Sequence, residues 1–146
     1  MKLKKIISKL SLEGKVSLLS GFDNWHTPDI KKYGIPKIKM SDGPNGVRGD
    51  SSTPQTSACF PSPILLGATW NEKLIKKIGS ATGEEALYKD VDVLLAPTIN
   101  LHRHPLGGRH FECYSEDPVL TSKIACSYVS GCLLYTSDAA DEYSRV

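Results

Sequence analysis

Apolar residues recur at helical spacing in two stretches of the first ninety positions. Residues 3–20 repeat apolar positions on one face, which favours an amphipathic helix. Ser11 can cap a second helical segment within this stretch, because its hydroxyl can accept a backbone hydrogen bond, and Gly21 is suited to end it. Farther along, Asn71 can cap an amphipathic helix that we expect to run to about Lys89.

Short apolar runs predict strands between these helices. Ile38 and Met40 alternate with lysines, and two further runs cover residues 64–66 and 91–95. A strand at 64–66, a helix to about residue 89 and a strand at 91–95 would form a βαβ unit. A helical pattern then returns over residues 119–131. The pattern therefore predicts the α/β class.

Two polar stretches follow predicted strands. SDGPNG at 41–46 has turn residues throughout, and NLHRHPLGGRHFECYSEDP at 100–118 follows the strand at 91–95. In α/β folds, ligands bind at the carboxyl ends of parallel strands. We therefore expect both stretches on one side of the sheet, lining a pocket that suits a sugar or a phosphate.

The 100–118 stretch is rich in charge. It holds three of the four histidines, with these charged residues: Arg103, Arg109, Glu112, Glu116 and Asp117. Pro118 indicates that a helix begins only there, so Glu112 and Glu116 are not expected on one helix face. We interpret the carboxylates as partners of the arginines that stabilise an irregular loop. The sequence leaves open which arginine faces the pocket.

Other features are open to two interpretations. Asp42 could cap a turn, or its carboxylate could accept hydrogen bonds from ligand hydroxyls. His102 and His104 would share a side if the chain is extended, but no third ligand marks a metal site, so ordinary hydrogen bonding is the preferred interpretation. Gly107-Gly108 fits no nucleotide-binding motif. We expect neither metal nor cofactor.

Composition adds little to this picture. The 146 residues carry a net charge of +2, with scattered lysines, so nothing calls for a nucleic-acid partner. No stretch approaches the roughly 20 apolar residues of a membrane span. The N-terminus lacks a convincing signal peptide, and the four cysteines lack CxxC spacing. We expect free thiols and a cytoplasmic location.

Four segments carry a specific resemblance. They are KMSDGPNGVRG (39–49), CFPSPILLGATWNEKLIKKIG (59–79), GEEAL (83–87) and LLAPTINLHRHPLGGRHFECYSEDP (94–118), and LLSGFDNWHT (18–27) agrees with them. In this order and spacing the chain, from about Leu10 to Gly131, resembles the N-terminal domain of glycoside hydrolase family 3, near its β-glucosidases.

The resemblance implies a fold and an activity. The fold would be a partial (β/α)8 TIM-type barrel containing only the first few βα units, spanning residues 1–131. The family removes terminal β-linked sugars with retention of configuration, which needs a nucleophilic carboxylate and an acid/base carboxylate. By resemblance, Asp42, Arg103 and, less directly, Arg48 bind the substrate sugar. Arg109, Glu112, Glu116 and Asp117 match positions that stabilise the loop.

The resemblance also implies what is missing. The family's nucleophile and acid/base residues lie later than this chain reaches, and a barrel of about 250 residues is longer than 146. We therefore expect this fragment to be inactive by itself. The segment CLLYTSDAADEYSRV (132–146) departs from the family pattern and resembles a translated sequencing adapter, so we expect it to be non-native.

Three alternatives to the β-glucosidase interpretation stay open. The parent protein could be a β-xylosidase or another exo-glycosidase of the same family. It could be a non-catalytic carbohydrate-binding protein on the same scaffold. The charged loop could also serve only to stabilise a βα fragment.

Overall fold

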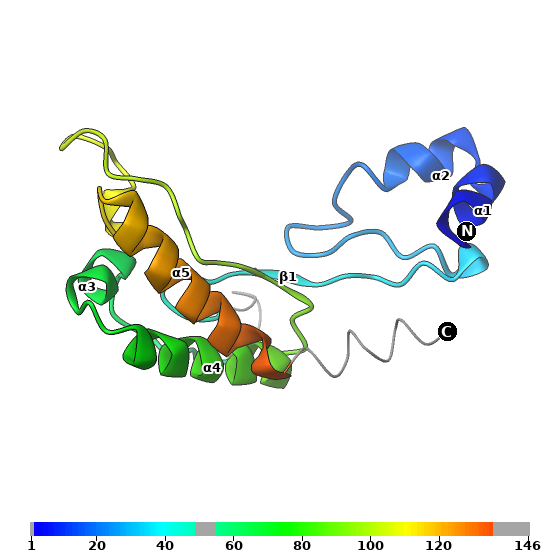
Figure 1. The fold of residues 1–146 in the computed structure, drawn as a ribbon. Helices are drawn as coiled ribbons and strands as arrows, with labels where there is room; N and C mark the ends of the chain where they lie inside the picture. The colour runs from blue at the N-terminus through cyan, green and yellow to red at the C-terminus, as the bar shows by residue number, and fades with distance from the viewer. Residues whose placement is uncertain (1, 49–54, 136–146) are drawn as a thin grey trace.

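Two parallel strands and five α-helices form the described part of the chain (Figure 1). The structure is a computed structural model and describes residues 2–48 and 55–135. In chain order the elements are α1 (Lys2–Lys9), α2 (Leu12–Ser17), β1 (Met40–Asp42), α3 (Pro63–Ala68), α4 (Glu72–Tyr88), β2 (Val93–Leu95) and α5 (Pro118–Cys132). This arrangement confirms the α/β class.

The N-terminal region forms two helices, as the capping position of Ser11 predicts. Ser11 separates them and caps α2, because its side chain accepts a hydrogen bond from the Gly14 amide at 3.1 Å. The expected end at Gly21 was wrong, since α2 stops at Ser17. In Figure 1, α1 and α2 stand apart from α3, α4 and α5, and an extended segment leads from α2 towards β1.

β1 and β2 pair in parallel, with Asp42 opposite Leu95. The chain between them contains α3 and α4, so the crossover unit starts at β1 and not at residue 64. Because the strands run in the same direction, the segments that follow Asp42 and Leu95 leave the same edge of the pair. This confirms that the two polar stretches begin on one side of the sheet.

The strand expected at residues 64–66 was wrong, because these residues lie in α3. Pro63 occupies the first turn of that helix, where its missing N–H costs nothing. Pro63 and Leu66 are buried while Ile64 and Leu65 are exposed, which is the three-residue spacing of a helix. An apolar run this short has no periodicity that separates the two structures.

α4 and α5 pack along their length and form the main core. Both begin as expected: the Asn71 side chain caps α4, and Pro118 starts α5. Glycines permit the close contact, since a Cβ at Gly79 or Gly131 would collide with the backbone of the other helix. Ile75, Ile124 and Tyr128 are buried at this interface. The two helices therefore form one closely packed layer.

Two remaining points concern the ends and the surface. The segment expected to be non-native lies largely outside the described residues, which end at 135 after a short 3-10 turn, Leu133–Tyr135. Within the described ranges, no helix combines the length and apolar character that crossing a bilayer requires.

Candidate functional site

A cavity of about 560 Å³ opens at the carboxyl ends of β1 and β2. Its wall comes from three parts of the chain: the turn after β1, residues 57–59, and the end of β2 with the segment that follows it. The charged residues in the wall are Asp42, Arg48, Arg109 and Glu112. Four of the seven residues predicted from the sequence are thus brought together at one strand-end site.

The turn after β1 directs Asp42 and Arg48 to the same place. The Arg48 amide donates a hydrogen bond to the Asp42 carbonyl oxygen at 3.0 Å, which closes the turn. The Arg48 guanidinium then lies 3.5 Å from the Asp42 carboxylate, and both side chains are open to solvent. Asp42 is the last residue of β1, and within residues 2–48 and 55–135 no backbone amide donates a hydrogen bond to its carboxylate. Besides pairing with Arg48, this solvent-exposed carboxylate can accept hydrogen bonds from a ligand.

Arg109 and Glu112 form the opposite wall. Arg109 donates two hydrogen bonds to Glu112, from Nε to Oε1 at 2.8 Å and from Nη2 to Oε2 at 2.7 Å. The hydroxyl of Thr98 donates a third bond to Glu112 at 3.3 Å. The Arg109 bonds hold the pKa of Glu112 below its ordinary value, and they raise the pKa of Arg109. Glu112 therefore remains an ionised carboxylate that holds the Arg109 guanidinium in place.

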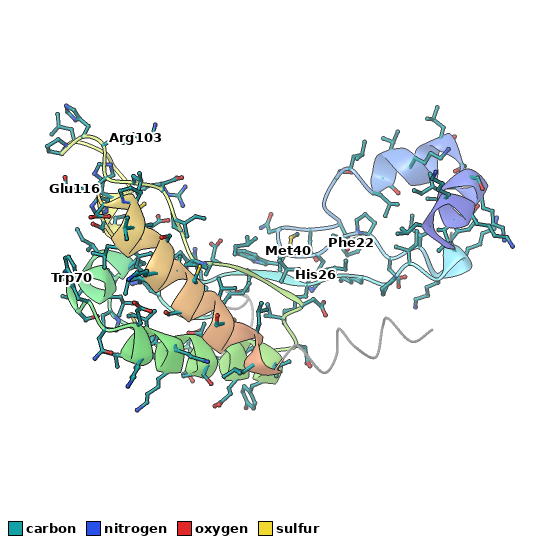
Figure 2. All side chains as sticks on the ribbon, in the orientation of Figure 1. Phe22, His26, Met40, Trp70, Arg103 and Glu116 are labelled. Atoms are coloured by element: carbon teal, nitrogen blue, oxygen red, sulfur yellow. The ribbon has the colours of Figure 1, made fainter. Side chains whose placement is uncertain are left out.

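Arg103 lies in a neighbouring cavity of about 550 Å³, on the loop between β2 and α5 (Figure 2). Its cavity shares Thr98 and Arg109 with the Asp42 cavity. Asp42 and Arg103 leave the same edge of the sheet, but in this structure they do not line one pocket. The sequence predicts one pocket lined by both stretches, whereas in the structure Arg109 lines both cavities and lies between Asp42 and Arg103.

The other two predicted residues lie away from both cavities. Asp117 caps α5, since its Oδ1 accepts hydrogen bonds from the Val119 and Leu120 amides at 2.6 and 3.1 Å. Glu116 is exposed, and no described residue forms an ion pair with it. The stabilising carboxylates thus act at separate points, one on Arg109 and one at the helix start.

The histidines of the loop have separate surroundings. The ring of His102 stacks on that of His110, with centroids 5.0 Å apart, and His102 Nε2 lies 2.8 Å from the His110 carbonyl oxygen. His104 Nδ1 instead accepts from the Leu106 amide. Among residues 2–48 and 55–135 no cluster of three potential metal ligands occurs. The rings here order the loop that carries Arg109.

Sequence reasoning missed two contributions to the site. Phe111 is 53% exposed and presents an aromatic surface to the Asp42 cavity. Glu85 and Lys89, at the end of α4, contact the backbone that carries Arg48. Their four-residue spacing can be seen in the sequence, but such pairs are common on helix surfaces, so the spacing does not predict that Lys89 is buried.

Comparison with known proteins gives a consistent result. Residues 8–134 match the glycosyl hydrolase family 3 N terminal domain. A β-glucosidase of Rhizobium radiobacter is 55% identical over 128 residues, which cover 86% of this chain and 16% of that protein. Thermostable β-glucosidase B of Acetivibrio thermocellus is 42% identical over 137 residues, covering 88% and 18%. The chain thus spans about a sixth of the length of these curated relatives.

Solved structures agree. The β-glucosidase of Kluyveromyces marxianus in complex with glucose has a TM-score of 0.83 at 41% identity, covering 90% of this chain and 16% of that one. β-Glucosidase 3B of Thermotoga neapolitana in complex with α-D-glucose has a TM-score of 0.77 at 39% identity, covering 90% and 21%.

Proposed function

Because this chain belongs to glycosyl hydrolase family 3, as part of that family's N-terminal domain, we propose that it supplies part of the sugar pocket of a β-glucosidase. The parent enzyme hydrolyses terminal non-reducing β-D-glucosyl residues with retention of configuration. The described strands are the start of a (β/α)8 barrel that later parts of the protein complete.

The strand-end cavity carries this proposal. A sugar ring presents adjacent hydroxyls, each of which can donate and accept a hydrogen bond. The Asp42 carboxylate accepts from them, and the Arg48 guanidinium beside it donates. Arg103 adds donors from the neighbouring cavity, while Glu112 holds Arg109 between the two sites. The complexes of relatives with glucose support the same class of ligand.

The proposal assigns sugar binding to this chain and the catalytic carboxylates to other parts of the parent protein. A retaining glycosidase needs two carboxylates about 5–5.5 Å apart, one as nucleophile and one as acid/base. We assign neither role to a residue of this chain, so the 146-residue chain alone should hydrolyse no glucoside. Its residues orient the sugar for carboxylates that belong to later parts of the parent protein.

Hydrolysis of aryl β-D-glucosides by the full-length protein tests the proposal. Asp42→Asn should lower kcat/KM about 10- to 100-fold, because a hydrogen bond to a charged group contributes about 1.5–3 kcal/mol. Asp90→Asn, an exposed carboxylate outside the cavity, is the matched control. NMR of the first anomer released tests retention.

The assay also separates the alternatives. Faster hydrolysis of the aryl β-xyloside would assign a β-xylosidase instead. Glucose binding without hydrolysis would assign a carbohydrate-binding protein. Unchanged sugar affinity in Asp42→Asn would leave Asp42 with a structural role only.

A further inference from the structure

A buried ion pair lies beneath the cavity that holds Asp42 and Arg48. Glu85 is in the last turn of α4 and Lys89 caps its C-terminus. Lys89 Nζ is 2.8 Å from Glu85 Oε1, and the Lys89 side chain is only 1% exposed. A lysine buried this deeply is uncommon, and it needs partners for each N–H of its ammonium group.

Besides Glu85, those partners come from the two segments that carry the cavity lining, residues 43–48 and 57–59. Lys89 Nζ donates to the Val47 carbonyl oxygen at 2.7 Å and to Ser57 Oγ at 2.6 Å. Ser57 Oγ in turn donates to the Arg48 carbonyl oxygen at 3.1 Å. The ammonium group therefore reaches Val47 directly and Arg48 through the Ser57 hydroxyl.

Glu85 binds the same two segments from the other side of the pair. Its Oε1 accepts from the Ala58 amide at 3.0 Å, and its Oε2 lies 3.5 Å from the Val47 amide nitrogen. Burial alone would raise the pKa of Glu85, but the bonds from Lys89 and Ala58 outweigh burial, so the pKa is lowered. Glu85 thus stays charged, and both side chains link α4 to Val47.

We propose that Glu85 and Lys89 are positioning residues for the sugar pocket, because they hold the backbone from which Arg48 faces Asp42. This inference rests on the proposed function of that pocket. Neither residue touches the sugar. They act through Val47, which is fully buried, and through Ser57, which bridges to Arg48.

Two variants of the full-length enzyme test the proposal. The double variant Glu85→Gln/Lys89→Met removes both charges and leaves no unpaired buried ion. Ser57→Ala removes the bond from Lys89 to the Ser57 hydroxyl and with it the bridge to Arg48, at an exposed position and with both charges kept, so it should fold normally. Lys77→Met, at an exposed position of the same helix, is the matched control.

Sugar affinity is the readout that distinguishes positioning from stability. We expect KM for an aryl β-glucoside and Ki for glucose to rise about tenfold in the double variant, with a smaller rise, about threefold, in Ser57→Ala. We expect kcat to change less than KM, and Lys77→Met to match the wild type. Hydrogen exchange in peptides covering residues 43–48 should become faster in the double variant.

The outcomes test the positioning role and the proposed sugar pocket separately. Wild-type KM and Ki in both variants, even with a lowered Tm, would overturn the positioning role and leave the pair purely structural. A second result would be that the wild-type enzyme binds no glucose while residues 43–48 still exchange hydrogen faster in the double variant. That result would contradict the proposed sugar pocket but would support the role of the pair in holding the turn.

Discussion

The two segments that form the cavity walls are held in different ways. The turn after β1 is tied to a distant helix through the buried Glu85–Lys89 pair, and Val47 within it is fully buried. The segment after β2 is held mainly by its own residues, through the Arg109–Glu112 bonds and the stacked rings of His102 and His110.

This difference has a physical consequence. Breaking a contact in a buried, desolvated pair leaves a charge without solvent, whereas an exposed pair can exchange its partner for water. Arg109 has a side chain that is 78% exposed, compared with 1% for Lys89. We therefore expect substitutions in the first segment to cost more stability than equivalent substitutions in the second.

The largest effect should come from breaking the buried pair on one side. Lys89→Met leaves Glu85 charged and unpaired, and it should lower the free energy of unfolding by about 3–5 kcal/mol. Adding Glu85→Gln should recover part of this loss. Denaturation in urea measures both changes, and an equally stable single variant would show that the pair contributes nothing.

Glycine substitutions compare the two segments directly. Gly46 has φ of +130°, and a Cβ there would collide with the Ala58 carbonyl oxygen. Gly46→Ala should therefore cost about 2–3 kcal/mol. Gly108→Ala, in the segment after β2, meets open space and should stay within about 0.5 kcal/mol. Similar losses of stability at both positions would contradict the proposed difference between the two segments.

A smaller effect is expected where the second segment ends. Asp117 accepts hydrogen bonds from the first amides of α5, so Asp117→Ala should cost about 1 kcal/mol. Asp117→Asn, which keeps an accepting oxygen, should restore most of it. Thermal unfolding of the three proteins checks this, and KM for the glucoside should not change.

The smallest effect concerns Glu112 and pH. Its pKa is lowered in the folded protein, chiefly by the Arg109 bonds, so its stabilising contribution is complete above the unfolded pKa of about 4.3 and is lost as pH falls through the lower folded pKa. Because Arg109 is exposed, the contribution should be below about 1 kcal/mol.

Stability curves from pH 6 to pH 3 test that sign. The wild-type protein should lose more stability over this range than Glu112→Gln, and high salt should reduce the difference. Parallel curves for the two proteins would mean that the pair adds nothing to the segment after β2.

Local sequence patterns predicted the starts of α2, α4 and α5 and the class of the fold. Ser11 and Asn71 cap helices through bonds to amides three residues away, and Pro118 occupies the first turn of α5, so each start depends only on neighbours in the chain. The end of β2 at Leu95 also followed from a local apolar run, whereas β1 ends at Asp42, two residues into the stretch predicted as a turn.

Tertiary structure decided what those patterns left open. It placed residues 64–66 in a helix, set Arg109 between Asp42 and Arg103, and buried Lys89 against Val47. Lys89 and Val47 are 42 positions apart. Contacts across such a separation depend on how whole elements pack, so the spacing of residues within one segment cannot predict them.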